Sequence, residues 1–306
     1  MARSSRISII ICTYDRADYL RDTLQSLLKN KADPDRYELL IIDNNSSDNT
    51  PAVAHQFIDS FPDHNIRYIK ESQQGLSFAR NRGIREAKNP ILLFLDDDIL
   101  TGSQFIRHWL IFFDQHADAK CAGGRIEVQF DDPRPSWMSH FLLPLLGYHN
   151  LGSTVKTYGQ RKYPFGGNMA FRQSIFDEYG FFNTDLGRKG EELKASEEKE
   201  FFRRLKNDNI EIYYLPDAKL DHRVDNERLT PDYIKRQAVG LGQSIALQLR
   251  QKTLASKIAK GSSELFKLIV SLGLFLPYTF TLQWSKAVML IKFRKWILEG
   301  YLSVSQ

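Results

Sequence analysis

The chain has 306 residues, of which 42% are hydrophobic and 26% charged, a composition that indicates a folded globular protein and excludes global disorder. Its length is enough for one large α/β domain with an appendage, or for two modest domains. The formal charge of +5 is uneven, because residues 223–306 carry 13 Lys and Arg against 5 Asp and Glu, while the remainder carries 29 against 32. We therefore expect an anionic surface as partner for the C-terminal part. Without a recognisable nucleic-acid module, no nucleic-acid partner is expected.

The two cysteines, Cys12 and Cys121, lie far apart in apolar surroundings, so their spacing fits neither a metal finger nor a thioredoxin motif. They indicate a reduced, cytosolic setting. The first six residues run straight into an apolar segment typical of a strand, without a signal region, so we do not expect secretion.

Apolar runs typical of buried strands alternate with amphipathic runs typical of helices in the first hundred residues. The expected strands are 7–12, 37–42, 66–69 and 91–95, and the expected helices are 18–28, 51–60 and 75–87. Thr50 is the expected N-cap of the second helix, with Pro51 at its first helical position. Near-continuous apolar strands between helices predict a mostly parallel sheet with both faces covered.

The second half is less regular. We expect a helix over 104–116, a strand within 121–130, a helix from Ser196 and a strand over 210–215. Residues 131–161 lack periodicity, and long irregular stretches of this kind usually line a site.

Carboxylates follow two of the predicted parallel strands. Asp43 ends the second strand, and Asp96, Asp97 and Asp98 end the fourth. Ligands bind beyond the carboxyl ends of strands in open α/β sheets, so both groups should face the same rim. Asp43 could accept a hydrogen bond from a nucleobase or ribose, and Asp98 could ligate a cation that bridges a diphosphate. The alternatives are a turn or cap aspartate at Asp43 and a solvated turn at the triple aspartate.

The segment Gly75–Gly83 combines two glycines with Arg80 and Arg82 at the start of a helix, where backbone N–H groups suit an anion. A basic surface helix is the alternative. Walker A spacing is absent, which argues against an ordinary ATPase.

Acidic residues open the helix expected after residue 196. With Ser196 as N-cap, Glu197 and Glu198 occupy the first turn, where acids favour the helix dipole. The functional alternative makes one of them a general base, and Glu191 and Glu192 are candidates of the same type.

Two further segments carry polar groups. Phe165–Arg172 joins glycines to Asn168, which suits either a turn that contacts a sugar or an ordinary tight turn into a strand. Asp221–Arg223 follows the last predicted strand, where His222 could be a metal ligand through neutral imidazole or an incidental residue.

Taken in order, these segments resemble the family 2 glycosyltransferases of the GT-A fold over residues 6–225. The resemblance rests on six motifs: Thr13–Arg16, Asp43–Asp48, Gly75–Gly83, Asp96-x-Asp98, Gly167–Arg172 and Ser196–Glu198. Glu198 stands where many members have Asp, and Ser196 replaces Gly, so Glu197 and Glu192 stay open as alternatives for the base.

The resemblance implies a Rossmann-like GT-A domain that performs inverting transfer of a sugar from a nucleotide-diphosphate donor. The acceptor would be a hydroxyl of a glycan or of a polyprenyl-linked molecule, in polysaccharide or glycoconjugate biosynthesis, with Mn²⁺ or Mg²⁺ as cofactor. Glu198 would be the catalytic base, and Asp98 with His222 would hold the metal. The donor side would comprise Thr13, Tyr14, Arg16, Asp43, Arg80, Asp96 and Asp97, and the acceptor side Gly167, Asn168 and Glu197.

We expect a catalytic domain over residues 1–225, with a nucleotide-binding half at 1–100 and an acceptor-side half at 101–225. Residues 226–306 would form a helical appendage that associates with a membrane. Residues 265–282 reach only the lower limit for a span, and 284–302 form a basic amphipathic pattern suited to the headgroup region. We therefore expect a cytoplasmic protein, peripheral or monotopic at the cytoplasmic face of a membrane. Packing on the catalytic domain and a true span are the alternatives.

Two other functions remain open. A sugar-nucleotide nucleotidyltransferase would normally have a Gly-rich loop after the first strand, whereas this chain has Thr13–Arg16 there. A membrane-docked scaffold without catalysis would not need acids at every key position. A haloacid-dehalogenase-type phosphatase is excluded, because Leu100 stands where that motif needs Thr or Val.

Overall fold

The computed structural model describes residues 5–160, 162–186, 197–249, 253–273 and 275–304. Its internal contacts divide the chain into two units, Met1–Glu127 with His149–Arg223, and Val128–Tyr148 with Val224–Gln306. Each unit is described by itself below. The expected domain boundary at residue 225 stays a prediction.

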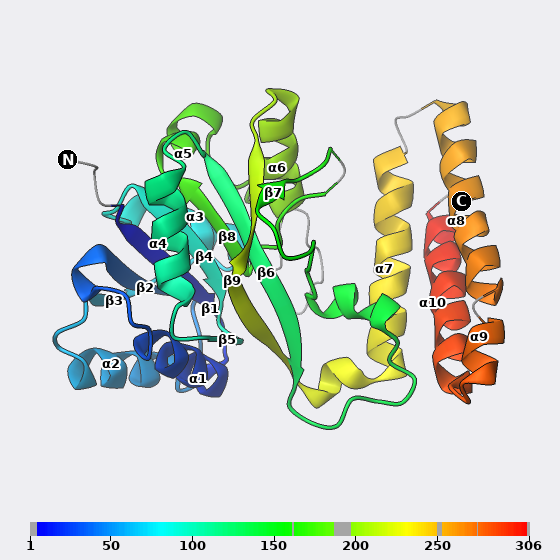
Figure 1. Ribbon diagram of the computed structural model, residues 1–306, viewed down its shortest axis with the longest axis horizontal. Coiled ribbons are helices and arrows are strands. Elements are labelled where there is room, and N and C mark those ends of the chain that lie inside the picture. Colours follow the sequence, from blue (N-terminus) through cyan, green and yellow to red (C-terminus); the bar gives the residue numbers. More distant parts are fainter. Residues whose placement is uncertain (1–4, 161, 187–196, 250–252, 274, 305–306) are drawn as a thin grey trace. The chain divides into compact units, whose positions relative to one another are not determined.

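Four parallel strands form one half of the sheet in the first unit, in the order β3-β2-β1-β4 (Figure 1). They are β1 (Ile7–Thr13), β2 (Tyr37–Asp43), β3 (Ile66–Lys70) and β4 (Ile91–Asp96). Every residue of β2 is buried, and β1 and β4 are buried almost throughout, which explains their continuous apolar sequences.

The other half of the sheet contains antiparallel pairs. Strand β8 (Asn168–Arg172) runs antiparallel to both β4 and β6 (Cys121–Phe130), and β9 (Ile212–Val224) pairs antiparallel with the short strands β5 (Ile99–Thr101) and β7 (Lys156–Thr157). The sheet is therefore mixed, and the expectation of a mostly parallel sheet holds only for its first half. The difference arises because β8 enters from the rim, after a long excursion of the chain, without a crossover helix that would return it in parallel.

Helices cover both faces of this sheet. Helices α1 (Ala17–Leu28), α2 (Thr50–Ser60) and α4 (Phe105–Gln115) share a core with Ile7, Ile9 and Ile11 of β1. Helices α3 (Leu76–Glu86), α5 (Ser174–Tyr179) and α6 (Glu197–Asn207) pack with Ile10 on the opposite face. Because side chains alternate along a strand, β1 serves both cores and lies between two layers of helices.

Some element ends differ from expectation. Helix α2 begins at Thr50 with Asn49 as its N-cap, one residue earlier than expected. Strand β9 is longer than expected and includes Asp221–Arg223, which lie within the strand. The irregular stretch contains a 3₁₀ helix, η2 (His140–Leu146), and two more such helices occur at η1 (Pro34–Arg36) and η3 (Asn226–Leu229).

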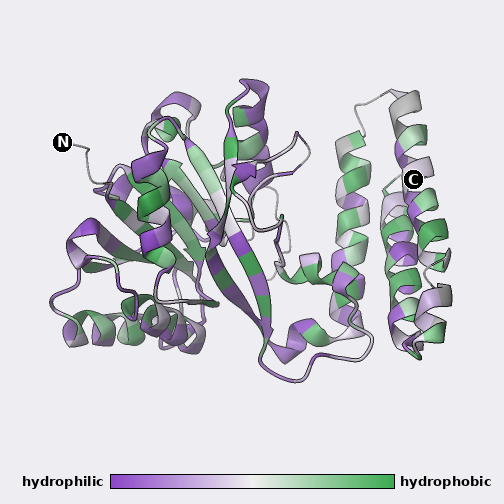
Figure 2. Cartoon of the chain, in the orientation of Figure 1, coloured by the Kyte–Doolittle hydropathy of each residue, from purple (hydrophilic) through white to green (hydrophobic). Residues whose placement is uncertain are grey.

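The second unit is mainly helical, as expected for the C-terminal region. Its helices are α7 (Pro231–Leu249), α8 (Leu254–Gly273), α9 (Phe275–Phe280) and α10 (Trp284–Ser303), and Figure 2 shows many hydrophobic residues along them. Met289, Leu290, Phe293 and Ile297 of α10 are buried in a core that also contains Ile234 and Ala238 of α7. The amphipathic segment expected to lie on a membrane thus provides core residues. None of the helices, as far as their residues are described, is long and apolar enough to cross a bilayer.

Gly83 allows α3 to lie close to β1, since a Cβ at this position would overlap the Ile10 side chain. We expect Gly83→Val to lower the free energy of unfolding by about 1–3 kcal/mol, the usual cost of overpacking a core. Gly102→Val is the matched control, because no atom lies within 4 Å of the position that a Cβ would take there. Urea denaturation checks both variants, and equal stabilities would contradict the packing described here.

Candidate functional site

Asp43 lies at the carboxyl end of β2, beside the end of β1. Its backbone is in register with Thr13, whose carbonyl oxygen accepts a hydrogen bond from the Asn44 N–H at 2.9 Å. The Asp43 carboxylate is fully buried, with Oδ1 accepting from the Ser46 N–H at 2.8 Å and Oδ2 from the Tyr68 hydroxyl at 2.5 Å. Because hydrogen bonds to an ionised carboxylate are strong, these two donors fix its orientation.

The triple aspartate lies where β4 ends, with Asp96 as the last strand residue and Asp97 and Asp98 in the turn before β5. Arg16 lies against it, with Nη1 at 3.1 Å from Asp97 Oδ1 and at 2.7 Å from Asp98 Oδ2. Burial raises the pKa of Asp97 to about 6, although the Arg16 guanidinium opposes this shift. Asp97 and Asp98 are both buried, whereas Asp96 is half-buried.

Backbone hydrogen bonds hold this turn in place. The Thr23 hydroxyl of α1 donates to the Asp97 carbonyl oxygen at 2.7 Å, and the Arg223 N–H of β9 donates to the Asp98 carbonyl oxygen at 2.8 Å. Pairing of β5 with β9 sets Ile99 opposite His222. Helix α1 on one side and strand β9 on the other therefore hold the backbone that carries Asp97 and Asp98.

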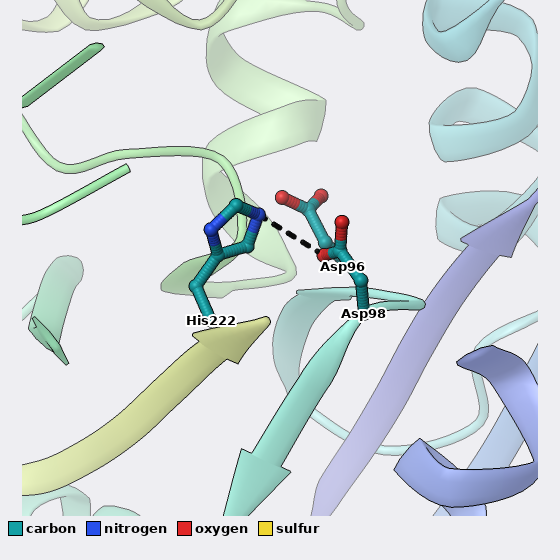
Figure 3. A group of neighbouring side chains, drawn as sticks. All are labelled: Asp96, Asp98 and His222. Carbon is teal, nitrogen blue, oxygen red and sulfur yellow. Dashed lines mark ion pairs between the residues drawn. The ribbon is translucent and has the colours of Figure 1, made fainter. Parts of the chain in front are cut away.

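Asp96, Asp98 and His222 form a candidate metal centre (Figure 3). One ligand atom from each lies within 4.8 Å of the others, and His222 Nε2 is 3.2 Å from Asp98 Oδ1. Ligand atoms around a six-coordinate Mg²⁺ with ~2.1 Å bonds lie roughly 3–4 Å apart. The two carboxylates and the imidazole therefore suit such a cation once their ligand atoms move slightly closer together. Arg16 is bound to the other oxygen of Asp98.

A second charged cluster joins α3 to α6. Arg80 Nη1 is 2.8 Å from Glu197 Oε1, and Arg80 Nη2 is 3.0 Å from Glu198 Oε1. Although burial works against its charge, the two glutamates hold the pKa of Arg80 above its ordinary value. Burial raises the pKa of Glu198 to about 6, the charge of Glu197 adds to the rise, and Arg80 opposes it.

The two glutamates differ in access to solvent. The Glu197 side chain is 1% exposed and the Glu198 side chain 19% exposed. A general base must reach a hydroxyl that arrives from solution, so the geometry favours Glu198 for that task. The alternative Glu192, together with Glu191 and the expected cap Ser196, lies outside the described residues.

Two consecutive glycines connect the clusters. A Cβ on Gly166 would overlap Glu198 Oε1 and Arg80 Nη2, and a Cβ on Gly167 would lie 2.5 Å from Asp96 Oδ2. The glycines thus leave room for the Glu198 and Asp96 side chains, and the charge of Asp96 adds to the rise in the pKa of Glu198. Neither glycine has a positive φ, so the absence of a side chain is what the site requires of them.

Asn168 is tied to the sheet. Its fully buried amide donates to the carbonyl oxygens of Arg125 at 3.0 Å and Ala218 at 2.9 Å, which belong to β6 and β9. Tyr14, after β1, is 38% exposed. The structure therefore brings most of the expected site residues to one rim of the sheet. The Asn168 amide instead donates hydrogen bonds to backbone carbonyl oxygens of the sheet.

The sequence did not identify three residues that shape the site. Tyr68 donates to Asp43, Thr23 holds the Asp97 turn, and Gly166 leaves room for Glu198. Tyr68 lies on β3 next to Asp43 because β2 and β3 pair in parallel, a register that the apolar pattern alone does not give. Thr23 lies on an amphipathic helix, where nothing in the local pattern distinguishes it. For Gly166, the sequence showed a glycine pair but not the groups that face it.

The sequence model of the family described as Glycosyl transferase family 2 matches residues 8–180. The chain is similar to the glucosyl-dolichyl phosphate glucuronosyltransferase of Haloferax volcanii, with 22% identity over 75% of this chain and 72% of the relative. It is also 34% identical to the glycosyltransferase AglE of the same organism, over 59% of this chain but only 57% of that relative.

Solved structures share the fold. The mannosyltransferase PcManGT from Pyrobaculum calidifontis, in complex with GDP-Man and Mn²⁺, aligns with a TM-score of 0.62 at 16% identity, over 98% of this chain and 87% of that one. TarS 1–349 of S. aureus, in complex with UDP-GlcNAc, aligns with a TM-score of 0.56 at 16% identity, over 98% and 90%.

Proposed function

The chain belongs to glycosyl transferase family 2 and is a glycosyltransferase, and we propose that it moves a sugar from a nucleotide-diphosphate donor to an acceptor hydroxyl with inversion. The observation that carries this proposal is that Glu198 and Asp96 lie against the consecutive glycines Gly166 and Gly167, close enough for the charge of Asp96 to raise the pKa of Glu198. A candidate base therefore lies near a candidate metal centre. Because the family match is to glycosyltransferases, nothing now supports the two alternative functions, a nucleotidyltransferase and a non-catalytic scaffold.

Relatives support the substrate classes. Structures that share the fold were solved in complex with GDP-Man or UDP-GlcNAc. The name of one relative includes glucosyl-dolichyl phosphate. We assign the donor as a nucleotide sugar and the acceptor as a glycan or polyprenyl-linked hydroxyl in glycoconjugate biosynthesis. Asp43 is the proposed partner of the nucleobase, with Thr13 and Tyr14 beside it, because it ends β2 at the same rim as Asp96.

Asp96, Asp98 and His222 would hold Mn²⁺ or Mg²⁺. When bound, the cation would supply Lewis-acid neutralisation of the departing diphosphate. Arg16 serves the site by orienting Asp98, because its guanidinium occupies Oδ2 and leaves Oδ1 facing His222.

Glu198 is the proposed general base. Its carboxylate would accept the proton of the acceptor hydroxyl as that oxygen attacks the anomeric carbon and the bond to the diphosphate breaks. A pKa of about 6 suits this role, because the group is largely ionised at pH 7 yet basic enough to take a proton. Arg80 positions it, and Glu197 completes the buried ion pair.

Changing the base should separate binding from transfer. We expect Glu198→Gln to lower kcat by at least about 100-fold, since the amide cannot accept the proton, while donor binding survives. Glu200→Gln is the matched control, because Glu200 lies in the same first turn and pairs with Arg204. Transfer assays with a panel of UDP-, GDP- and dTDP-sugars check both, and full activity in Glu198→Gln would move the base elsewhere.

Removing the Arg80 charge should change the pH dependence. In the wild type, kcat/KM should fall below about pH 6 as Glu198 becomes protonated, and Arg80 keeps that pKa from rising further. In Arg80→Gln the charges of Glu197 and Asp96, and the neighbouring Tyr163, remain, so the acidic limb should move to higher pH. Arg82→Gln on the same helix is the control. An acidic limb that stays in place in Arg80→Gln would contradict the role given to Arg80.

The metal centre can be tested without turnover. We expect Asp98→Asn to weaken Mn²⁺ binding by about tenfold or more, because a charged oxygen ligand is lost. Electron paramagnetic resonance of free Mn²⁺ measures this directly. Asp18→Asn is the control, because its side chain is 90% exposed and lies on α1 in an ion pair with Arg21. Equal Mn²⁺ affinities in Asp98→Asn and the wild type would remove Asp98 from the centre.

A further inference from the structure

Helix α8 of the second unit has its polar side inside. Glu264 is 3% exposed and forms ion pairs with Lys260 at 3.0 Å and Lys267 at 2.6 Å, one turn before and after it. Ser271 is also buried, and its hydroxyl donates to the Lys267 carbonyl oxygen at 2.9 Å. A helix at the surface of a water-soluble unit normally has the opposite arrangement.

The outward side of the same helix is apolar. Leu265, Ile269 and Leu272 recur at helical spacing and are each more than half exposed, and Phe266 beside them is 64% exposed. We call these four residues the outer face of α8. In the same unit, Phe280 at the end of α9 and Leu282 in the turn before α10 are 85% and 84% exposed. Contiguous exposed apolar side chains of this size mark an interaction surface.

Charge distinguishes the kinds of partner. Residues 253–304 contain seven Lys and Arg but only two acids, Glu264 and Glu299. Glu264 is buried in its two ion pairs, and Glu299 lies 3.9 Å from Lys295. The net positive charge of this segment complements anionic lipid headgroups, which attract basic segments next to a bilayer.

We propose that the outer face of α8 docks into the interfacial region of an anionic lipid bilayer. The helix lies along the membrane plane, with Leu265, Phe266, Ile269 and Leu272 among the upper acyl chains. The net positive charge of residues 253–304 draws this side of the unit toward the lipid phosphates. The proposal moves the docking element from 284–302, where Met289, Leu290, Phe293 and Ile297 belong to the core, to α8. It does not depend on the transfer reaction.

Flotation of the full chain with vesicles tests the proposal. We expect the wild type to float with phosphatidylcholine vesicles that contain phosphatidylglycerol, and more weakly with phosphatidylcholine alone. The double variant Phe266→Ser/Ile269→Ser should lower the partition coefficient by about tenfold or more, because two large apolar side chains no longer enter the bilayer. The matched control is Phe181→Ser/Ile111→Ser, which removes one exposed Phe and one exposed Ile from the first unit and should float as the wild type does.

Two outcomes would overturn the proposal. One is flotation of the Phe266/Ile269 variant equal to that of the wild type, with circular dichroism showing the same helix content. The other is a wild type that binds neither kind of vesicle but forms a dimer that the double variant dissociates, which would assign the outer face to a second copy of the chain.

Discussion

The site depends on gathering carboxylates where little water reaches them and offsetting their repulsion with two arginines. Arg16 compensates Asp97 and Asp98, and Arg80 compensates Glu197 and Glu198. Like charges at this spacing cannot all stay ionised in a low-dielectric setting without such partners. Burial still raises the pKa of Asp97 and of Glu198, and neighbouring carboxylates add to the rise. A bound cation would remove the remaining imbalance on the Asp98 side.

The convergence of Asp43 with the triple aspartate could be predicted from sequence for a simple physical reason. Continuous apolar strands separated by helices indicate parallel pairing, and parallel pairing brings carboxyl ends to one rim. The strand register has this form, since Thr13 and Cys12 of β1 pair with Asp43 and Asp96 on either side. The apolar pattern of these strands thus predicts which strand ends share one rim, although it does not give their register.

Other features depended on contacts that no local pattern encodes. Arg80 lies on a helix with glycines typical of anion binding, yet its partners are more than a hundred residues away on α6. The direction of β8 and the extension of β9 through His222 are set by pairing with β4 and β5, which apolar periodicity does not specify. In the second unit, the sequence pattern indicated 284–302 as the segment at the membrane. Only the fold shows that Met289 and Phe293 of α10 are buried in the core, whereas the outer face of α8 is exposed.

The amide of Asn168 bridges Arg125 and Ala218 where the antiparallel strands meet, and Gly124 leaves the room it needs, because a Cβ there would overlap that amide. One short run, Gly166–Asn168, therefore combines clearance for the Glu198 and Asp96 side chains with a bridge that joins the strands. A substitution in this run can therefore affect the packing of the strands and the site at the same time. Loss of turnover after a change at Asn168 would report on the integrity of that strand junction, and it would give no evidence that the amide touches the sugar.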